Sequence, residues 1–225
     1  MYIAREGARV ILAFIGLHII CLLAAWFAAG GQWGHHFAGV FAVLAVIFAL
    51  GALFSLYFFR DPERTPPEGD NLAVSPADGR ILSVEDVVED RFIHGPARRV
   101  SIFMNVFDVH VNRFPVSGTV RFQEYRPGRF FNASLDKASV HNEALSLGIE
   151  MEGSGTRILV RQIAGLIARR IVCRVKEGDP ARRGERFGMI RFGSRVEVYF
   201  PPPIRIMVNA GEKVIAGQSV LAEFP

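Results

Sequence analysis

The sequence predicts a mainly β domain of the α+β class, preceded by a two-helix transmembrane hairpin. No Asp, Glu, Lys or Arg occurs from Val10 to Phe59, although charged residues make up 21% of the chain. A proline-rich polar segment, Asp61–Asp70, follows this interval. Beyond it, short β-branched or aromatic runs alternate with Gly and Pro, which indicates barrel-like or sandwich-like units of a turn followed by a strand.

The charge-free interval contains two apolar runs, Val10–Ala29 and Phe37–Phe59, separated by the polar, Gly-rich segment Gly30–His36. A helix that crosses a bilayer needs about 20 largely apolar residues, and each run meets this requirement. The first run is too long for the apolar part of a cleaved signal peptide, and a second run follows it. We therefore expect residues 1–59 to form a membrane anchor with two transmembrane helices.

The arginines around the two runs predict the orientation of the anchor. Arg5 and Arg9 precede the first run, Arg60 and Arg64 follow the second, and the connecting loop has no Lys or Arg. Basic residues concentrate on the cytoplasmic side of membrane proteins. We expect both termini in the cytoplasm and the soluble domain on the cytoplasmic face of the cell (inner) membrane.

The soluble part is only mildly basic, with 24 basic and 21 acidic residues beyond Phe59. We expect no nucleic acid among its partners. The two cysteines, Cys21 and Cys173, are too few for a disulfide framework or a four-ligand metal site, and we expect no metal.

The polar segment predicts a linker over residues 60–71, because three prolines stiffen it and it lacks apolar residues. Residues 72–225 are then the folded domain. Leu135–Leu145 is expected to be a short helix or an ordered loop, and Leu166–Arg170 one helical turn. The expected strands are Arg80–Val88, Arg99–Phe103, Gly118–Tyr125, Ile149–Glu152, Arg157–Ile163, Arg170–Val175, Arg195–Phe200 and Ser219–Phe224.

Five short segments carry residue types suited to chemistry. They are FFRDPER at Phe58–Arg64, SPADG at Ser75–Gly79, FDVHVNRFP at Phe107–Pro115, LDKAS at Leu135–Ser139 and FGS at Phe192–Ser194. Their combination and order behind a membrane anchor resemble the phosphatidylserine decarboxylase family, particularly its short bacterial branch. The resemblance extends from about residue 57 to the C-terminus.

The resemblance implies self-cleavage between Gly193 and Ser194 into a β chain, 1–193, and an α chain, 194–225. The Ser194 hydroxyl would attack the preceding carbonyl, and the serine would become a pyruvoyl group. This group would form a Schiff base with the amine of phosphatidylserine and release phosphatidylethanolamine, with no other cofactor. Gly193 would leave space at a crowded bond and permit unusual backbone angles. The two chains are expected to remain a heterodimer, with higher oligomers left open.

His110 is the candidate proton carrier, because imidazole changes its protonation near neutral pH. It matches the first His of the family motif, whereas Arg113 stands where long-form members have a second His. Asp78 matches the acidic member of the family's set and is expected to orient His110. Asp108 is a second candidate partner, since residues two apart on a strand share a face.

Lys137, Arg113 and Asn112 are the expected contacts to the lipid phosphate or carboxylate. The lipid backbone, ester or ether, is left open. The repeated turns before strands also favour an alternative, a membrane-tethered carrier or adaptor domain, although the exposed Lys of a carrier hairpin is missing. A third hypothesis is a membrane-bound hydrolase that uses Ser194 and His110 directly. Cleavage after Gly193 would favour the decarboxylase over both.

Overall fold

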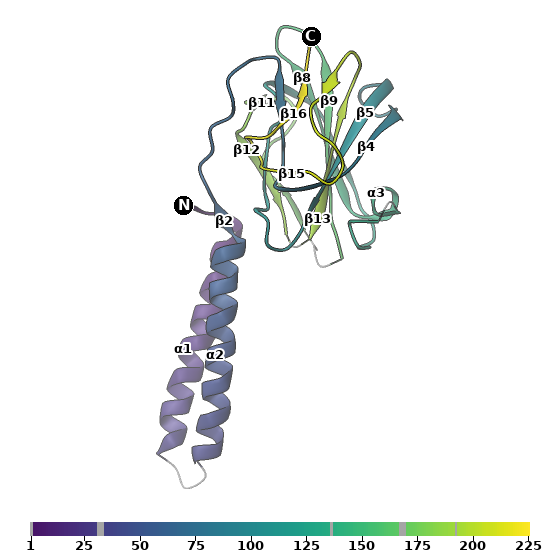
Figure 1. The fold of residues 1–225 in the computed structure, drawn as a ribbon. Coiled ribbons are helices and arrows are strands. Elements are labelled where there is room, and N and C mark those ends of the chain that lie inside the picture. The colour runs from purple at the N-terminus through teal and green to yellow at the C-terminus, as the bar shows by residue number, and fades with distance from the viewer. Residues whose placement is uncertain (1, 31–33, 136, 167–169, 192) are drawn as a thin grey trace. The chain divides into compact units, whose positions relative to one another are not determined.

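The structure, a computed structural model, describes residues 2–30, 34–135, 137–166, 170–191 and 193–225. The chain divides into two compact units, Met1–Glu63 and Arg64–Pro225. The first is a helical hairpin and the second is built mostly from strands (Figure 1). The predicted fold class, a mainly β domain after two apolar helices, is confirmed.

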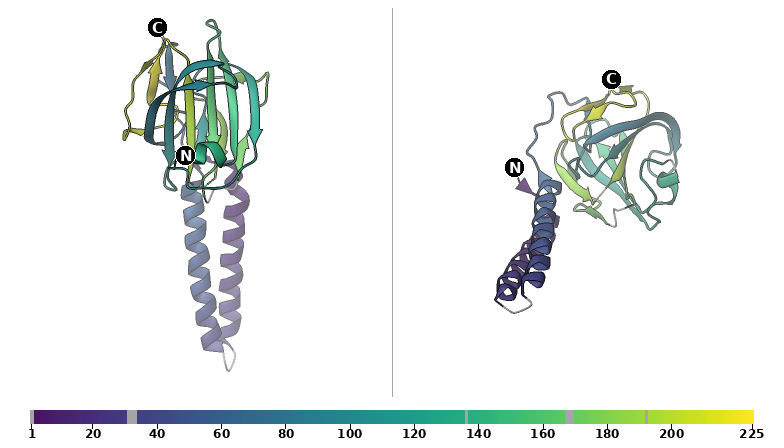
Figure 2. Two further views of the ribbon diagram at one scale, coloured as in Figure 1. Left: turned by 90° about the vertical axis from the view of Figure 1, so that its right-hand side faces the viewer. Right: turned by 60° about the horizontal axis from the view of Figure 1, so that its bottom comes forward.

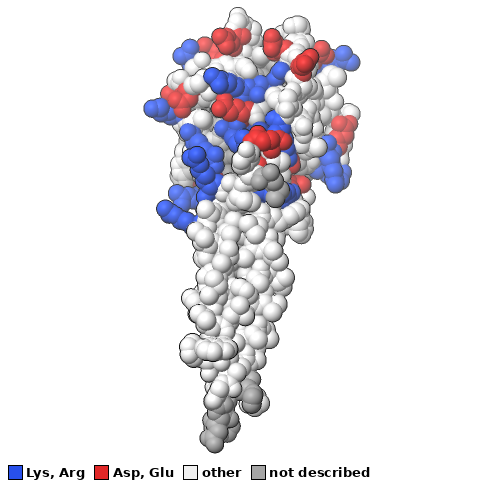
Figure 3. All heavy atoms as spheres, turned by 90° about the vertical axis from the view of Figure 1, so that its left-hand side faces the viewer, with Lys and Arg blue, Asp and Glu red and all other residues white. Residues whose placement is uncertain are grey.

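The first unit consists of two long apolar helices, α1 (Ala8–Ala29) and α2 (Gly34–Phe58). Before them lie β1 (Tyr2–Ile3) and the 3-10 turn η1 (Arg5–Gly7), and after them lies β2 (Arg60–Asp61), which pairs with β1. On the face that Figure 3 shows, the long apolar part of the hairpin carries no charged side chain.

Both helices are long and apolar enough to cross a membrane, and most of their large apolar side chains are exposed. These properties are compatible with a membrane anchor. One polar side chain between the helices is satisfied internally, since His18 Nδ1 lies 2.9 Å from the carbonyl oxygen of Ala45. Burying an imidazole without such a partner would be costly.

The second unit is dominated by one eight-stranded antiparallel sheet that curls on itself (Figure 2). Its strands, in spatial order, are β11 (Pro180–Ala181), β7 (Gly118–Arg126), β8 (Ala144–Met151), β9 (Arg157–Ile163), β13 (Ser194–Phe200), β5 (Gly95–Met104), β4 (Gly79–Glu89) and β15 (Lys213–Val214). Two three-stranded sheets accompany it: β10 (Ile171–Cys173), β12 (Arg186–Ile190) and β6 (Val111–Arg113), and β14 (Arg205–Ile206), β16 (Val220–Glu223) and β3 (Leu72–Val74). The short helix α3 spans Lys137–His141.

Strand β13 lies between β9 and β5, and all seven of its residues are buried. Side chains alternate across a strand. Val196, Val198 and Phe200 accordingly belong to the main hydrophobic core, to which each of the other seven strands of the large sheet also contributes. Arg195 and Glu197 occupy the opposite face and are also buried.

Several expected boundaries differ from the structure. The segment expected as helix or loop, Leu135–Leu145, contains α3 but ends inside β8, which begins at Ala144 and not at Ile149. Strand pairing with β7 and β9 overrides the local sequence there. Strand β12 was not expected. The expected turn Leu166–Arg170 includes residues 167–169, which lie outside the described residues.

The second unit begins at Arg64, inside the expected linker 60–71. Residues 64–71 lie along the β domain because two arginines, Arg183 and Arg64, attach them to it. The Arg183 guanidinium donates to the carbonyl oxygens of Pro67 at 2.9 Å and Leu72 at 3.0 Å. Arg64 in turn binds Asp78.

Candidate active site

Ser194 is the first residue of β13, and the β13–β5 register places it opposite Met104. Its side chain is completely buried. The hydroxyl donates to the Met104 sulfur at 3.4 Å. A thioether is a weak acceptor, so this contact leaves the hydroxyl oxygen available as a nucleophile.

Gly193 has a backbone φ of +52°, in the left-handed region that favours glycine. A Cβ built on it would meet no described atom within 4 Å beyond its chain neighbours. Of the two reasons expected for glycine here, the unusual backbone angle is therefore present. The other reason, crowding around a Cβ, is absent among the described residues, because the space beside Gly193 is open.

Gly165 is a residue that the sequence analysis missed. A Cβ on Gly165 would lie 1.9 Å from the Gly193 carbonyl oxygen and 2.9 Å from its carbonyl carbon. Real Cβ atoms do not approach other atoms so closely, so the backbone of Gly165 packs directly on the carbonyl that precedes Ser194. No motif in the sequence indicates this contact, because it joins the end of β9 to the start of β13.

Two buried amides lie beside Met104. Asn112 in β6 directs Nδ2 toward the Pro76 carbonyl oxygen at 3.4 Å and the Met104 sulfur at 3.8 Å. Gln162 in β9 donates from Nε2 to Asn112 Oδ1 at 2.7 Å. Both amides are completely buried. The surroundings of Ser194 are thus polar and hold no ionised partner among the described contacts.

Gln162 was also missed, although the alternation of β9 could have indicated it. Ile158 and Val160 point into the main core. Gln162 is the next residue of the same face and pairs with Val196. A polar residue at a position that alternation assigns to the core is a signal for a special environment.

His110 is completely buried, and its Nδ1 lies 2.9 Å from the Asp108 carbonyl oxygen. A carbonyl oxygen only accepts, so Nδ1 carries a proton in this contact, and a neutral ring would then have its lone pair on Nε2. The Ile190 N–H donates to the His110 carbonyl oxygen at 3.4 Å, which ties the end of β12 to His110 just before the Gly193–Ser194 bond.

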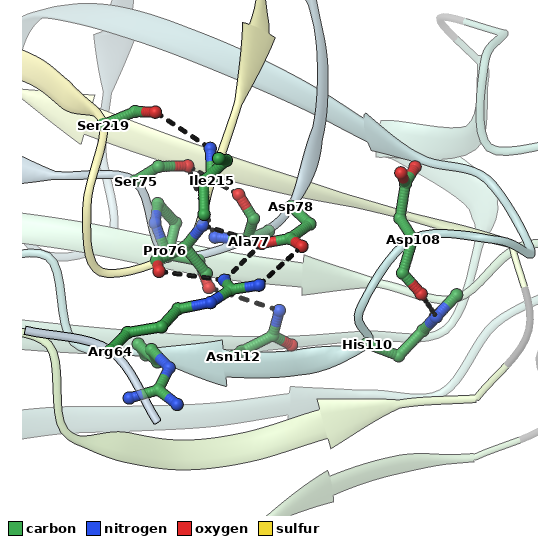
Figure 4. A network of polar contacts seen from close by, with 12 residues as sticks. Arg64, Ser75, Pro76, Ala77, Asp78, Asp108, His110, Asn112, Ile215 and Ser219 are labelled. Carbon is green, nitrogen blue, oxygen red and sulfur yellow. Dashed lines mark hydrogen bonds and ion pairs between the residues drawn. The ribbon is translucent and has the colours of Figure 1, made fainter. Parts of the chain in front are cut away.

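The expected partner carboxylates of His110 point elsewhere (Figure 4). Asp108 lies in a turn and not on a strand, and its carboxylate accepts the Asn105 N–H at 2.8 Å. Asp78 binds Arg64 through both carboxylate oxygens, with Arg64 Nη2 at 2.8 Å from Asp78 Oδ2. Asp78 Oδ1 also accepts the Ala216 N–H at 2.8 Å. The described contacts therefore give Asp78 and His110 different partners.

Arg64 is a further residue that the sequence analysis did not assign to the site, although it ends the segment FFRDPER. Besides Asp78, it donates to the Ala216 carbonyl oxygen at 2.9 Å. Its guanidinium is largely buried. Arg64 thus fixes the SPADG loop to the loop around Ala216.

Two of the three expected substrate contacts, Arg113 and Asn112, point in different directions. Arg113 is buried and donates to the Gly184 carbonyl oxygen at 2.8 Å, whereas its neighbour Asn112 points the other way, toward Met104. Lys137 begins α3, but its side chain lies outside the described part of the structure. Within the described residues, no group of three or more His, Cys, Asp or Glu is arranged to hold a metal ion.

The other face of β13 carries a buried ionic cluster. The guanidinium of Arg195 lies 3.0 Å from Glu197 and donates to Ser101 Oγ at 2.8 Å. Glu197 also accepts from Ser139 of α3 at 2.7 Å and from the Tyr199 hydroxyl at 2.6 Å. Burial, with the neighbouring Glu197 carboxylate, raises the pKa of Tyr199 to about 12.

A family model described as phosphatidylserine decarboxylase matches residues 52–222, which include every site residue described above. The chain belongs to the phosphatidylserine decarboxylase family. Members of this family are lyases made as proenzymes, and they use a pyruvoyl group. The comparisons do not support the carrier and hydrolase alternatives.

Three relatives of the chain are named phosphatidylserine decarboxylase proenzyme. The protein from Oleidesulfovibrio alaskensis is 57% identical over 81% of this chain and 85% of its own length. The one from Syntrophus aciditrophicus is 48% identical over 99% and 98%. The one from Nitratidesulfovibrio vulgaris is 54% identical over 90% and 89%.

The residues around Ser194 fit a pyruvoyl group formed in place. Ser194 supplies a buried hydroxyl, and Gly193 supplies the left-handed backbone before it. Gly165 leaves a space that a Cβ would fill, directly at the Gly193 carbonyl.

Proposed function

We propose that this chain is a proenzyme that cuts itself between Gly193 and Ser194 and then decarboxylates phosphatidylserine to phosphatidylethanolamine. The observation that carries the proposal is the geometry at this bond. A buried hydroxyl, bound to a thioether, directly follows a left-handed glycine whose carbonyl packs on Gly165.

The cleavage chemistry follows from the groups at this bond. Ser194 Oγ attacks the Gly193 carbonyl carbon, the C–N bond breaks, and an ester replaces the amide. Loss of the Ser194 Cα proton then expels the Gly193 carboxylate and leaves a dehydroalanine. Water converts this residue to a pyruvoyl group and ammonia. His110 Nε2 takes the hydroxyl proton and returns it to the departing nitrogen.

The pyruvoyl carbonyl supplies an electron sink for the carbanion that loss of CO₂ creates. The chain's own residues do the rest. The buried walls around Ser194 exclude water, His110 Nε2 returns a proton to the substrate Cα, and the Asn112 amide binds a substrate oxygen. Lys137 and Arg113 are the further proposed contacts to the phosphate and carboxylate, and Arg113 reaches them only by exchanging its hydrogen bond to the Gly184 carbonyl for one to the substrate. Asp78 has a positioning role, because its ion pair with Arg64 holds the SPADG loop in place.

The two cleavage products stay together as a heterodimer. After cleavage, β13 remains hydrogen-bonded between β9 and β5 of the larger chain. The side chains of Arg195 and Glu197 keep their contacts to Ser101 and Ser139. The hairpin holds this heterodimer in the inner membrane, with the β domain on the cytoplasmic face, as the arginines flanking the helices favour.

The test compares two Gly–Ser pairs in the purified full-length protein. Gly153 also has a left-handed φ, +81°, and is followed by Ser154, but that pair is exposed. Ser194→Ala should remain uncut and inactive, because no hydroxyl can attack Gly193. Ser154→Ala should be cut and active like the wild type. Cleavage of the Ser194→Ala protein at Gly193, or full activity without cleavage, would contradict the proposal.

A further inference from the structure

Among the large apolar side chains exposed in the β domain, four lie on helix α3 or on the loops that follow β5 and β9 and connect β7 to β8. Phe107 is 62% exposed, Leu135 45%, Val140 62% and Leu166 65%. None of them belongs to a hydrophobic core cluster among the described residues. Contiguous exposed apolar groups on a protein surface mark interaction sites.

The strand register brings these four side chains to one end of the curled sheet. The end of β5 lies opposite the start of β13, and the end of β9 lies beside the same residues. The start of β8 lies opposite the end of β9 and of β7. The loops after β5, after β9 and between β7 and β8 therefore emerge together, at the end where Ser194 begins β13. Figure 2 shows α3 at this end of the sheet.

Hydrogen bonds hold these loops in place with their apolar side chains outward. The Phe107 N–H donates to Asn105 Oδ1 at 2.7 Å, within the turn that Asp108 closes. Helix α3, which carries Val140, is fixed through Ser139 to the buried Glu197. Phe107 and Val140 are thus presented by a hydrogen-bonded turn and an anchored helix.

The charges of the same loops favour an anionic surface. Arg129 and Arg170 are exposed there. The acidic side chains described in these loops are engaged or buried, since Asp108 closes its turn and Glu143 is 8% exposed. Apolar side chains that enter the headgroup region, flanked by basic ones, are the pattern of proteins that lie on anionic bilayers.

We propose that this loop surface, formed by Phe107, Leu135, Val140 and Leu166 with Arg129 and Arg170, inserts into the headgroup region of an anionic bilayer. The β domain thereby contacts the membrane independently of the helical hairpin. Because Ser194 lies buried at this end, phosphatidylserine reaches the site directly from the bilayer. This last step rests on the proposed function, whereas the insertion itself does not.

A quenching experiment tests the insertion. The chain has two tryptophans, Trp26 and Trp33, and replacing both with Phe gives a background for single probes. Phe107→Trp or Leu166→Trp is introduced into the full-length protein, which is reconstituted into vesicles of phosphatidylcholine and phosphatidylserine with brominated acyl chains. Val88→Trp is the matched control. Val88 is 69% exposed and lies near the end of β4 that is farther from Ser194.

The account predicts strong bromine quenching at positions 107 and 166 and little at position 88. Equal quenching at all three positions, or none at 107 and 166, would overturn the insertion. The result does not depend on catalysis, so an inactive protein that is quenched at 107 would contradict the proposed function and leave the insertion standing.

A kinetic comparison sharpens the result. The double variant Phe107→Ser and Leu166→Ser should lower the ratio of turnover on vesicles to turnover on short-chain phosphatidylserine dispersed in detergent about tenfold, with self-cleavage intact. Val88→Ser should keep the wild-type ratio. An unchanged ratio in the double variant would argue against entry of the lipid through this surface.

Discussion

The two faces of β13 differ in their chemistry although they belong to one strand of seven residues. The inward face begins with Ser194, whose hydroxyl contacts the Met104 thioether, and the buried amide of Asn112 contacts the same sulfur. The outward face carries the buried pair of Arg195 and Glu197. The Ser194 hydroxyl, which is the proposed nucleophile, thus has no charged partner among its described contacts. The charged groups lie behind the sheet, where they hold the strand in place.

This division predicts that chemistry and stability can be separated by mutation. Changes on the Ser194 side should affect rates in a protein that remains folded. Changes on the Arg195 side should lower the free energy of unfolding.

His110→Gln should lower the rates of the steps that need its proton by about 10²–10⁴-fold, the usual contribution of a positioned acid or base. If His110 serves decarboxylation alone, cut but inactive protein will accumulate; if it also serves cleavage, the precursor will persist. Gel electrophoresis and product assays distinguish the two outcomes. His94→Asn, at an exposed turn, is the control. Normal turnover in His110→Gln would remove this residue from the site.

Glu197→Gln should lower the free energy of unfolding by about 3–5 kcal/mol, because it leaves the buried Arg195 without its counterion. Denaturant unfolding in the Ser194→Ala background, which keeps the chain uncut, measures the change. In an otherwise wild-type background, the turnover of the folded fraction should be retained.

Glu223→Gln is the control for this prediction. Glu223 pairs with Arg205 at 3.9 Å, and Arg205 is mostly exposed. An exposed pair contributes about 1 kcal/mol or less. If the two substitutions had equal effects on unfolding, the buried cluster would not be what holds β13.

Gly165→Ala should slow self-cleavage about 10–100-fold, since overpacking costs typically about 1–3 kcal/mol and here acts on the Gly193 carbonyl. Gly118→Ala is the control, because its Cβ would lie 2.1 Å from the Glu150 carbonyl oxygen, away from Ser194. Both substitutions strain a backbone contact, but only Gly165→Ala should make the precursor persist in a time course. Equal slowing by both would indicate a general loss of stability.

Tyr199→Phe should remove a loss of folding stability that the wild-type side chain causes at alkaline pH. The pKa of Tyr199 is raised from 10.0 to about 12 by burial and by Glu197. The unfolded chain therefore releases this proton first, and the contribution to folding, fully present below pH 10, is lost as the pH rises toward 12. The loss amounts to about 3 kcal/mol or less. Unfolding of Ser194→Ala with and without Tyr199→Phe at pH 8 and pH 11 checks this. An equally steep alkaline loss in both proteins would contradict it.

The sequence predicted the elements whose pattern is local. The two apolar runs correspond to α1 and α2, and the alternating run Arg195–Phe200 corresponds to β13 within one residue. Strand β12 was missed because its sequence, RFGMI, contains an interior glycine and gives no clear alternation. The start of β8 was missed because pairing on both sides creates a strand that the local sequence does not favour.

The candidate site was predictable in its residue types but not in its pairings. Ser194, His110 and Asn112 follow from the motifs, and Gln162 could have followed from alternation. The pairing of Asp78 with Arg64 joins two loops, and the contact of Gly165 with Gly193 joins two strand ends. Such long-range contacts depend on the packed fold, which no motif encodes.

The most direct test of the account is the intact mass of the denatured, freshly purified full-length protein. The account predicts two chains, residues 1–193 and 194–225, with the smaller one beginning with a pyruvoyl group in place of Ser194. This fragment should resist Edman sequencing, because it has no free amine at its start. A fully active protein that is wholly uncut, or a small fragment that begins with ordinary serine, would contradict the central claim.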